Sequence, residues 1–177
     1  MRRTFLFSLA AATLLSFVGT ATAATKEDTL YIDLKDGRVV IEMRPDLAPK
    51  HVAQIKALAR AGKYDGIVFH RVIDGFMAQT GDPKGNGSGG MGEMLKAEFN
   101  KEPHTRGALS MARTNDPNSA QSQFFIVLKD SNFLDGKYTV WGRVVSGMEF
   151  VDKIKKGEPP ANPDKMIKVR VAADVKE

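Results

Sequence analysis

An arginine inside an apolar run is the feature of this sequence with the clearest chemical potential. Arg71 lies in the stretch 69–79, FHRVIDGFMAQ, which is otherwise apolar and strand-like at its start. A second aromatic run, QFFIVL, covers 123–128, and a glycine-rich loop at 85–90 lies between the two. A guanidinium beside apolar side chains, with no nucleophile or metal ligand close by, suits few reactions. Rotation of the peptide bond before a proline is one of them.

The spacing around Arg71 permits two interpretations. Period-two alternation in a strand places Phe69 and Ile73 on the same face as Arg71. The guanidinium either pairs with a carboxylate, such as Asp74 or Asp82, or it faces a substrate. Spacing alone does not decide between the two.

The second run carries side chains that would complement Arg71. The same alternation groups Gln123 with Phe125 and Val127 on one strand face. If the two runs are neighbours in a sheet, a guanidinium, an amide and aromatic rings meet on one surface.

Other chemistries have little support in the sequence. The three histidines are scattered without the spacing of metal ligands, so no metal site is expected. We expect His51 to face solvent on a helix and His70 to pack on the strand face opposite Arg71. No Gly-x-Ser-x-Gly motif surrounds a serine, and the absence of cysteine excludes thiol catalysis and disulfides. The loop 85–90 lacks the ending of a phosphate-binding P-loop, which favours a tight surface turn.

The first 23 residues have the pattern of a secretory signal peptide. Arg2 and Arg3 precede an apolar segment, 5–18, and Ala21-Thr22-Ala23 is a cleavage signal. We therefore expect export to the periplasm, a mature domain over 24–177 and no stable membrane anchor. Removal of the leader lowers the formal net charge from +5 to +3. That small, dispersed excess does not indicate nucleic-acid binding.

Hydrophobic periodicity predicts a mainly β domain with two helices. The spacing of apolar residues predicts helices over 49–61 and 148–156, each ending near a glycine. The strand candidates are 29–34, 38–43, 67–73, 76–80, 107–112, 123–128, 139–145 and 166–172. About eight strands and two helices favour a barrel or sandwich closed by helices. No coiled coil or long apolar edge is evident, so we expect a monomer.

Several of these stretches together resemble the cyclophilin-type peptidyl-prolyl isomerases. The resemblance runs from Thr29 to about Val171 and is densest over 69–82. Further matching motifs are GALSMA at 107–112, SQFFI at 122–126 and FLDGK at 133–137. Combined with the leader, they are similar to a bacterial periplasmic member. The resemblance implies a closed, eight-stranded antiparallel β-barrel capped by two α-helices, with the active site in a groove on its outer surface.

The resemblance also implies roles for individual residues. Arg71 corresponds to the catalytic arginine, and Gln79 to a glutamine that helps to orient it. The proline pocket and the groove around it correspond to Phe76, Met77, Ala112, Arg113, Gln123, Phe125, Phe133, Leu134 and Tyr138. No metal or organic cofactor is implied, and the partners are proline-containing unfolded or extended polypeptides. The implied function is cis-trans isomerisation of X-Pro bonds during folding of exported proteins.

The sequence departs from the family pattern at a few positions. Arg113 stands where many members have asparagine, and Tyr138 replaces a histidine common in eukaryotic members. Phe133 replaces the tryptophan of cyclosporin-sensitive members, which removes an indole N–H and argues against tight drug binding. The glycine-rich loop is one residue shorter, which could reshape the neighbouring subsite.

The alternative function is a non-catalytic binding module or holdase chaperone that binds proline segments without isomerising them. The presence of both Arg71 and Gln79 favours the enzyme.

Overall fold

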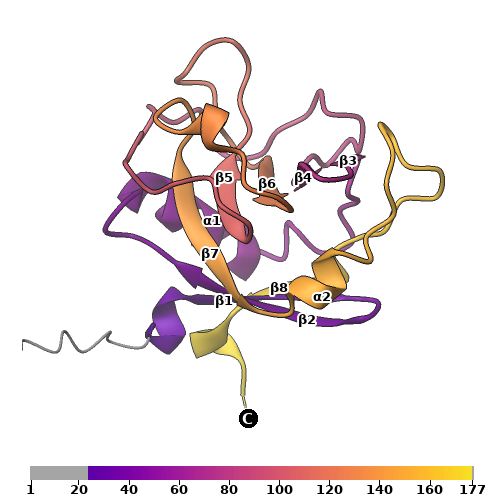
Figure 1. Cartoon of the computed structure of the whole chain (residues 1–177). Helices are drawn as coiled ribbons and strands as arrows, with labels where there is room; N and C mark the ends of the chain where they lie inside the picture. Colours follow the sequence, from indigo (N-terminus) through magenta and orange to yellow (C-terminus); the bar gives the residue numbers. More distant parts are fainter. Residues whose placement is uncertain (1–23, 177) are drawn as a thin grey trace, which may run out of the picture.

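The computed structural model describes residues 24–176, and these form one strongly curved sheet with helices packed against it (Figure 1). The predicted signal peptide lies outside the described residues. The strands are β1 (Thr29–Leu34), β2 (Gly37–Met43), β3 (Arg71–Ile73), β4 (Met77–Thr80), β5 (Ala108–Met111), β6 (Phe124–Val127), β7 (Val140–Ser146) and β8 (Lys168–Val171). The α-helices are α1 (Pro49–Arg60) and α2 (Met148–Val151), and short 3₁₀ turns cover Lys26–Asp28, Asn132–Leu134 and Ala172–Asp174.

The eight described strands form an antiparallel sheet whose ladder does not close. Their order is β3-β4-β6-β5-β7-β2-β1-β8, so β3 and β8 are the two edges. The prediction of a closed barrel is therefore wrong, and the sheet is an open half-barrel. Backbone bridges from Val72 to Gly157 and from Val68 to Lys165 cover the β3 edge instead of a strand.

The sequence of the covering segment explains why it cannot act as a further strand. Between the two bridges the chain contains Pro159, Pro160 and Pro163. Proline has no backbone N–H, so it cannot donate to a strand ladder. The same region shortens the predicted strand 67–73 to Arg71–Ile73, because Phe69 donates its N–H to the carbonyl of Asp164 rather than to a regular partner.

Most strand and helix types agree with the sequence-based expectations, with ends that differ by one or two residues. The main exception besides β3 is α2, which ends at Val151 although the apolar spacing predicted a helix to 156.

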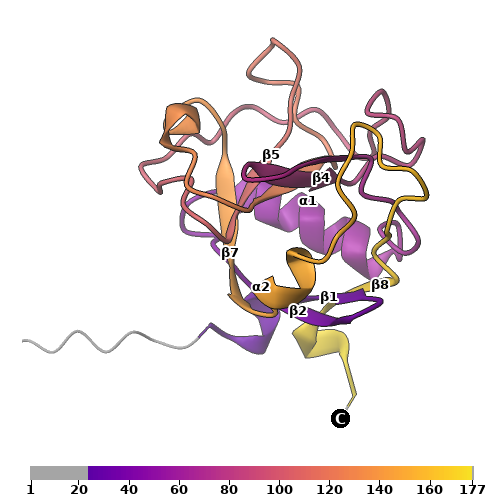
Figure 2. The same cartoon turned by 45° about the vertical axis from the view of Figure 1, so that its right-hand side comes forward.

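Helix α1 lies inside the curve of the sheet. Figure 2 shows α1 between β4 and β5 at the top and β1, β2 and β8 at the bottom. The apolar residues Val52, Ile55 and Ala59 of α1 join the main core inside the half-barrel.

His51, on the buried face of α1, contradicts the expectation of a solvent-facing side chain. Its side chain has no exposed surface, and its Nδ1 lies 2.6 Å from Oε2 of Glu98. The same carboxylate accepts the backbone N–H groups of Lys50 and His51 at the start of the helix. Glu98 therefore stabilises a helix end that has no capping side chain of its own.

The curved sheet carries hydrophobic clusters on both of its faces. The inner cluster contains Phe124 and Ile126 of β6, whereas Phe125 and Val127 of the same strand belong to a second cluster on the outer face. Alternation along one strand thus supplies both clusters. Only the outer cluster lies where a peptide could reach it.

Candidate active site

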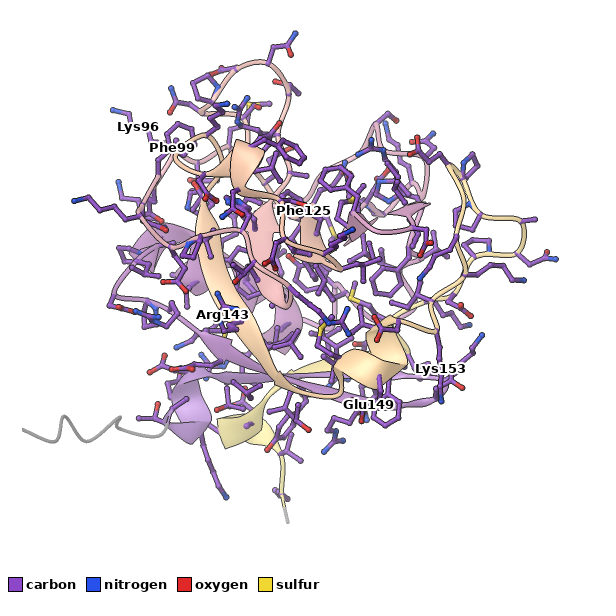
Figure 3. The ribbon with its side chains drawn as sticks, viewed as in Figure 1. Lys96, Phe99, Phe125, Arg143, Glu149 and Lys153 are labelled. Atoms are coloured by element: carbon purple, nitrogen blue, oxygen red, sulfur yellow. The ribbon has the colours of Figure 1, made fainter. Side chains whose placement is uncertain are left out.

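A row of side chains across three neighbouring strands forms the centre of the candidate site. Arg71 of β3 pairs in register with Gln79 of β4, and Gln79 pairs with Phe125 of β6. Directly opposed residues in a sheet project from the same face, so the three side chains lie side by side on the outer surface. Figure 3 shows Phe125 in the upper half of the molecule, away from β1, β2 and β8. The sequence grouped Arg71 with the amide of Gln123, but β4 lies between their two strands, so the amide of Gln79 stands between the guanidinium and Phe125.

Phe69 does not share this face with Arg71, although strict alternation placed it there. Its ring is fully buried in the inner cluster together with Val72. The reason is that residues before Arg71 do not form a regular strand, so period two does not extend to them. Ile73 does pack on the outer cluster.

A small pocket next to this row gathers most of the predicted site residues. It has a volume of about 130 Å³, which suits one compact ring better than a whole organic ligand. Buried side chains of Met77, Phe125 and Leu134 provide its apolar surface. Its lining residues are Arg71, Phe76, Met77, Gln79, Ala112, Arg113, Phe125, Leu134 and Tyr138.

Two of the predicted site residues lie beside this pocket rather than in its wall. Phe133 is 63% exposed, and its ring packs on Phe76 with 5.5 Å between centroids. Gln123 lines a second, adjacent pocket and not the first one. Phe133 therefore forms an outer rim, and Gln123 belongs to the next part of the groove.

The guanidinium of Arg71 is available to a ligand. Its only carboxylate partner among the described residues is Glu158, with 3.7 Å between Nε and Oε2 and both side chains close to half exposed. Neither Asp74 nor Asp82 pairs with it. The buried carboxylate of Asp82 instead accepts backbone N–H groups of the glycine-rich loop, from Lys84, Asn86 and Gly87. Burial would raise the pKa of Asp82, but these hydrogen bonds outweigh it and hold that pKa below its ordinary value.

Gln79 connects the row to the glycine-rich loop. Its Nε2 donates to Oε1 of Gln123 at 2.9 Å, and Nε2 of Gln123 donates to the carbonyls of Gly87 and Gly89. No side-chain hydrogen bond joins Gln79 to Arg71 among the described residues, and the two are paired through the backbones of β3 and β4. These amide hydrogen bonds hold Gln79 beside the guanidinium and connect it through Gln123 to the loop. Gly85 and Gly87 of this loop have positive φ angles, as a tight turn requires.

The family model described as cyclophilin-type peptidyl-prolyl cis-trans isomerase matches residues 29–172. The chain belongs to this family. It is 57% identical to a probable peptidyl-prolyl cis-trans isomerase of Brucella suis, over 90% of each chain. It is 45% identical to peptidyl-prolyl cis-trans isomerase B of Bacillus subtilis, over 73% of this chain and 92% of that one.

Solved cyclophilin structures share the fold. The cyclophilin AquaCyp293 from Hirschia baltica superposes with a TM-score of 0.80 at 32% identity, covering 86% of this chain and 77% of that chain. A Cryptosporidium parvum cyclophilin-type isomerase, solved in the presence of the dipeptide Ala-Pro, superposes with a TM-score of 0.75 at 28% identity, covering 81% and 98%. The activity of this cyclophilin is peptidyl-prolyl cis-trans isomerisation.

Beneath Phe125, this cyclophilin has a buried polar group that sequence reasoning did not find. Nδ1 of His104 lies 2.8 Å from Oδ1 of Asp135, and Nε2 lies 2.9 Å from Oγ of Ser110. The imidazole stacks on Phe125 at 6.2 Å between centroids. The arrangement of Ser110, His104 and Asp135 matches a Ser-His-Asp triad. Ser110 is fully buried, however, and its hydroxyl also donates to the carbonyl of Thr139 at 3.1 Å. A hydroxyl enclosed in this way cannot attack a peptide, so the group supports the pocket instead.

Within residues 24–176, no three His, Asp or Glu side chains are placed to share a metal ion. The helices of the same region are too short or too polar to cross a bilayer.

Proposed function

We propose that this cyclophilin binds extended, proline-containing peptides in the outer groove, with the proline ring in the pocket beside Arg71. The single observation that carries the proposal is the half-exposed guanidinium in the wall of a one-ring-sized pocket to which Met77, Phe125 and Leu134 contribute apolar surface. The Ala-Pro dipeptide of the Cryptosporidium parvum structure supports the same ligand class.

The physical demand on the site is to ease rotation about a conjugated bond. Amide resonance sets a barrier of roughly 18–20 kcal/mol, and conjugation of the nitrogen is lost in the twisted state. The guanidinium of Arg71 stays charged and donates from a rigid plane, so it favours a nitrogen whose lone pair is free to accept. Neither cleavage of a bond nor a proton transfer to carbon is needed.

The pocket must act on the twisted state more than on the planar states. Met77, Phe125 and Leu134 hold the ring while the preceding carbonyl turns, and binding that is equal in all states would not accelerate the step. An acceleration of about 10⁵ corresponds to roughly 7 kcal/mol. One charge-assisted hydrogen bond supplies about 1.5–3 kcal/mol, so positioning and exclusion of water supply the remainder. In this scheme Gln79 positions Arg71 through the strand pairing.

The proposed setting is the folding of exported chains in the periplasm. Support for it comes from the basic, apolar and small-residue segments of 1–23, which together have the order of a cleaved leader. Fusion of 1–23 to a reporter, followed by N-terminal sequencing of the exported product, tests this part. We expect cleavage directly after Ala23, and retention of the reporter in the cytoplasm would refute the proposed export.

The test of the catalytic proposal is an NMR exchange assay on a short X-Pro peptide, with an Ala-Pro peptide as competitor. We expect accelerated exchange, inhibition by the competitor and no effect of a chelator. A parallel assay of aggregation separates catalysis from holding. If the protein prevented aggregation but left exchange and proline-limited refolding unchanged, the groove would be a holdase site.

A further inference from the structure

Arg113 differs from every other arginine in residues 24–176. The other seven each lie within 4.0 Å of a carboxylate. The hydrogen bonds of the Arg113 guanidinium all go to backbone carbonyls: Nε and Nη2 donate to Lys137 at 3.2 and 2.9 Å, and Nη1 donates to Thr114 at 2.8 Å and to Asn115 at 3.5 Å. It is a fixed cation whose charge no acidic side chain of the described chain offsets.

Aromatic rings hold the same guanidinium in place. Its central carbon lies 4.5 Å from the ring centroid of Tyr138 and 6.0 Å from that of Phe99. Phe99 lies at the upper left of the molecule in Figure 3, at the outer edge of the loops. Carbonyl and ring contacts on several sides fix the orientation of the plane, so a ligand would lose little side-chain entropy at Arg113.

The position of Arg113 links two pockets of the groove. Together with Gln79 and Ala112 it lines both the proline pocket and an adjacent pocket of about 250 Å³. The adjacent pocket is otherwise lined by amides, hydroxyls, glycine backbone and one methionine. Arg113 is its only charged lining residue. The nearest acid along the chain, Asp116, uses its carboxylate to accept the N–H of Asn118.

A peptide with its proline in the first pocket must place a neighbouring residue at the second. The pockets share a wall, and consecutive Cα atoms lie only about 3.8 Å apart. A side chain that enters the second pocket lies near the positive charge of Arg113, and no carboxylate lines this pocket. This environment favours an anion and disfavours a cation.

We propose that the pocket beside the proline pocket selects an acidic side chain, glutamate or aspartate, within two residues of the substrate proline. Arg113 is the specificity-determining residue. The inference rests on the proposed binding of proline at Arg71 and adds a charge preference to it. A solvent-accessible ion pair of this kind corresponds to about a two- to fivefold preference for Glu over Gln.

The test compares kcat/KM for peptides that carry Glu, Gln or Lys at each of the two positions on either side of the proline. Wild type should prefer Glu over Gln and Gln over Lys at one or more positions, and high salt should reduce the difference. Arg113→Gln should bring the ratio of kcat/KM for Glu peptides to kcat/KM for Lys peptides close to one. Arg113→Glu should reverse the preference, so that Lys peptides react faster. Lys63→Gln, which removes an exposed positive charge in the turn after α1, serves as the matched control and should keep the wild-type ratio.

Dividing the Glu-to-Lys ratio of wild type by that of a variant cancels the intrinsic effect of each peptide residue on the uncatalysed rate. Equal rates for Glu and Lys peptides in wild type, or a preference that survives in Arg113→Gln, would overturn the inference. NMR titration with the same peptides measures the preference separately from turnover. A protein that binds Glu peptides better but catalyses none of them would refute the proposed function and leave the charge selection standing.

Discussion

Nε of Arg71 lies 3.7 Å from Oε2 of Glu158, which is beyond hydrogen-bond distance. Both groups are close to half exposed, so water screens the pair and its contribution to stability is small. A substrate imide can therefore approach the guanidinium without breaking a buried ion pair. This arrangement favours the substrate-facing interpretation, because Arg71 is neither buried nor paired with Asp74 or Asp82.

Arg71→Ala should reduce kcat/KM for an X-Pro peptide by about 10- to 100-fold, since it removes one charge-assisted hydrogen bond. Thermal unfolding should change little, because the side chain is surface-exposed. Arg38→Ala, which removes an arginine paired with Asp33 elsewhere on the sheet, is the control and should keep full activity. A normal rate for folded Arg71→Ala would show that the assigned role is wrong.

Phe125→Ala and Phe124→Ala form a matched pair on opposite faces of β6. Both side chains are at least 95% buried, so each substitution should lower the free energy of unfolding by about 3–5 kcal/mol. Only Phe125→Ala should also raise KM and lower kcat per folded molecule, because only Phe125 lines the proline pocket. Denaturant titration and the isomerase assay at low temperature separate the two effects. Equal specific activities of the two folded variants would contradict the placement of the pocket.

Gly89→Ala should disturb the glycine-rich loop. An added Cβ would overlap Oδ1 of Asp82, which binds the loop amides, while the carbonyl of Gly89 accepts from Gln123. We expect a loss of about 1–3 kcal/mol in stability together with lower kcat/KM. Gly66→Ala is the control: its φ is positive, unlike that of Gly89, and nothing lies within 4 Å of the added carbon. It should lose about 1–2 kcal/mol from backbone strain and keep its activity, as measured by denaturation and NMR exchange.

Stability should fall as the pH drops below about 6.5. Burial lowers the pKa values of His70 and His104 from their ordinary value of 6.5, so the unfolded chain binds protons first. The stabilising contribution is complete above the unfolded pKa and is lost as pH falls through the folded pKa, with a slope of at most about 1.4 kcal/mol per pH unit for each histidine. Carboxylates with lowered pKa values, such as Asp82, lose their stabilising contribution only at more acidic pH, when they become protonated.

His70→Leu isolates one of these contributions. Both ring nitrogens of His70 are buried without a hydrogen-bond partner, so an apolar replacement removes the titration without breaking a bond. We expect a flatter dependence of the free energy of unfolding on pH below about 6.5, measured by urea titration at several pH values. An unchanged slope would show that other groups control the acid response.

Sequence alone predicted what depends on local periodicity. Alternation correctly separated Phe125 from Phe124, and the apolar spacing after Pro49 correctly placed α1. The failures involve contacts between distant segments. Glu98 approaches His51 from 47 positions away, and Glu158 reaches Arg71 across the open edge of the sheet. The support under Phe125 joins His104 to Asp135, 31 residues apart. No local pattern predicts such pairs, because the three-dimensional path of the loops decides them.

Because side chains of β6 alternate between the two faces of the sheet, isomerase activity depends on the correct strand register. A slip of one residue against β4 would exchange Phe125 with Phe124, moving the pocket wall into the interior and an interior ring to the surface. No misregistered chain could then bind a proline ring. Turnover of a simple peptide would therefore count correctly assembled molecules in a preparation, where bulk spectroscopic signals of β-structure would not distinguish them.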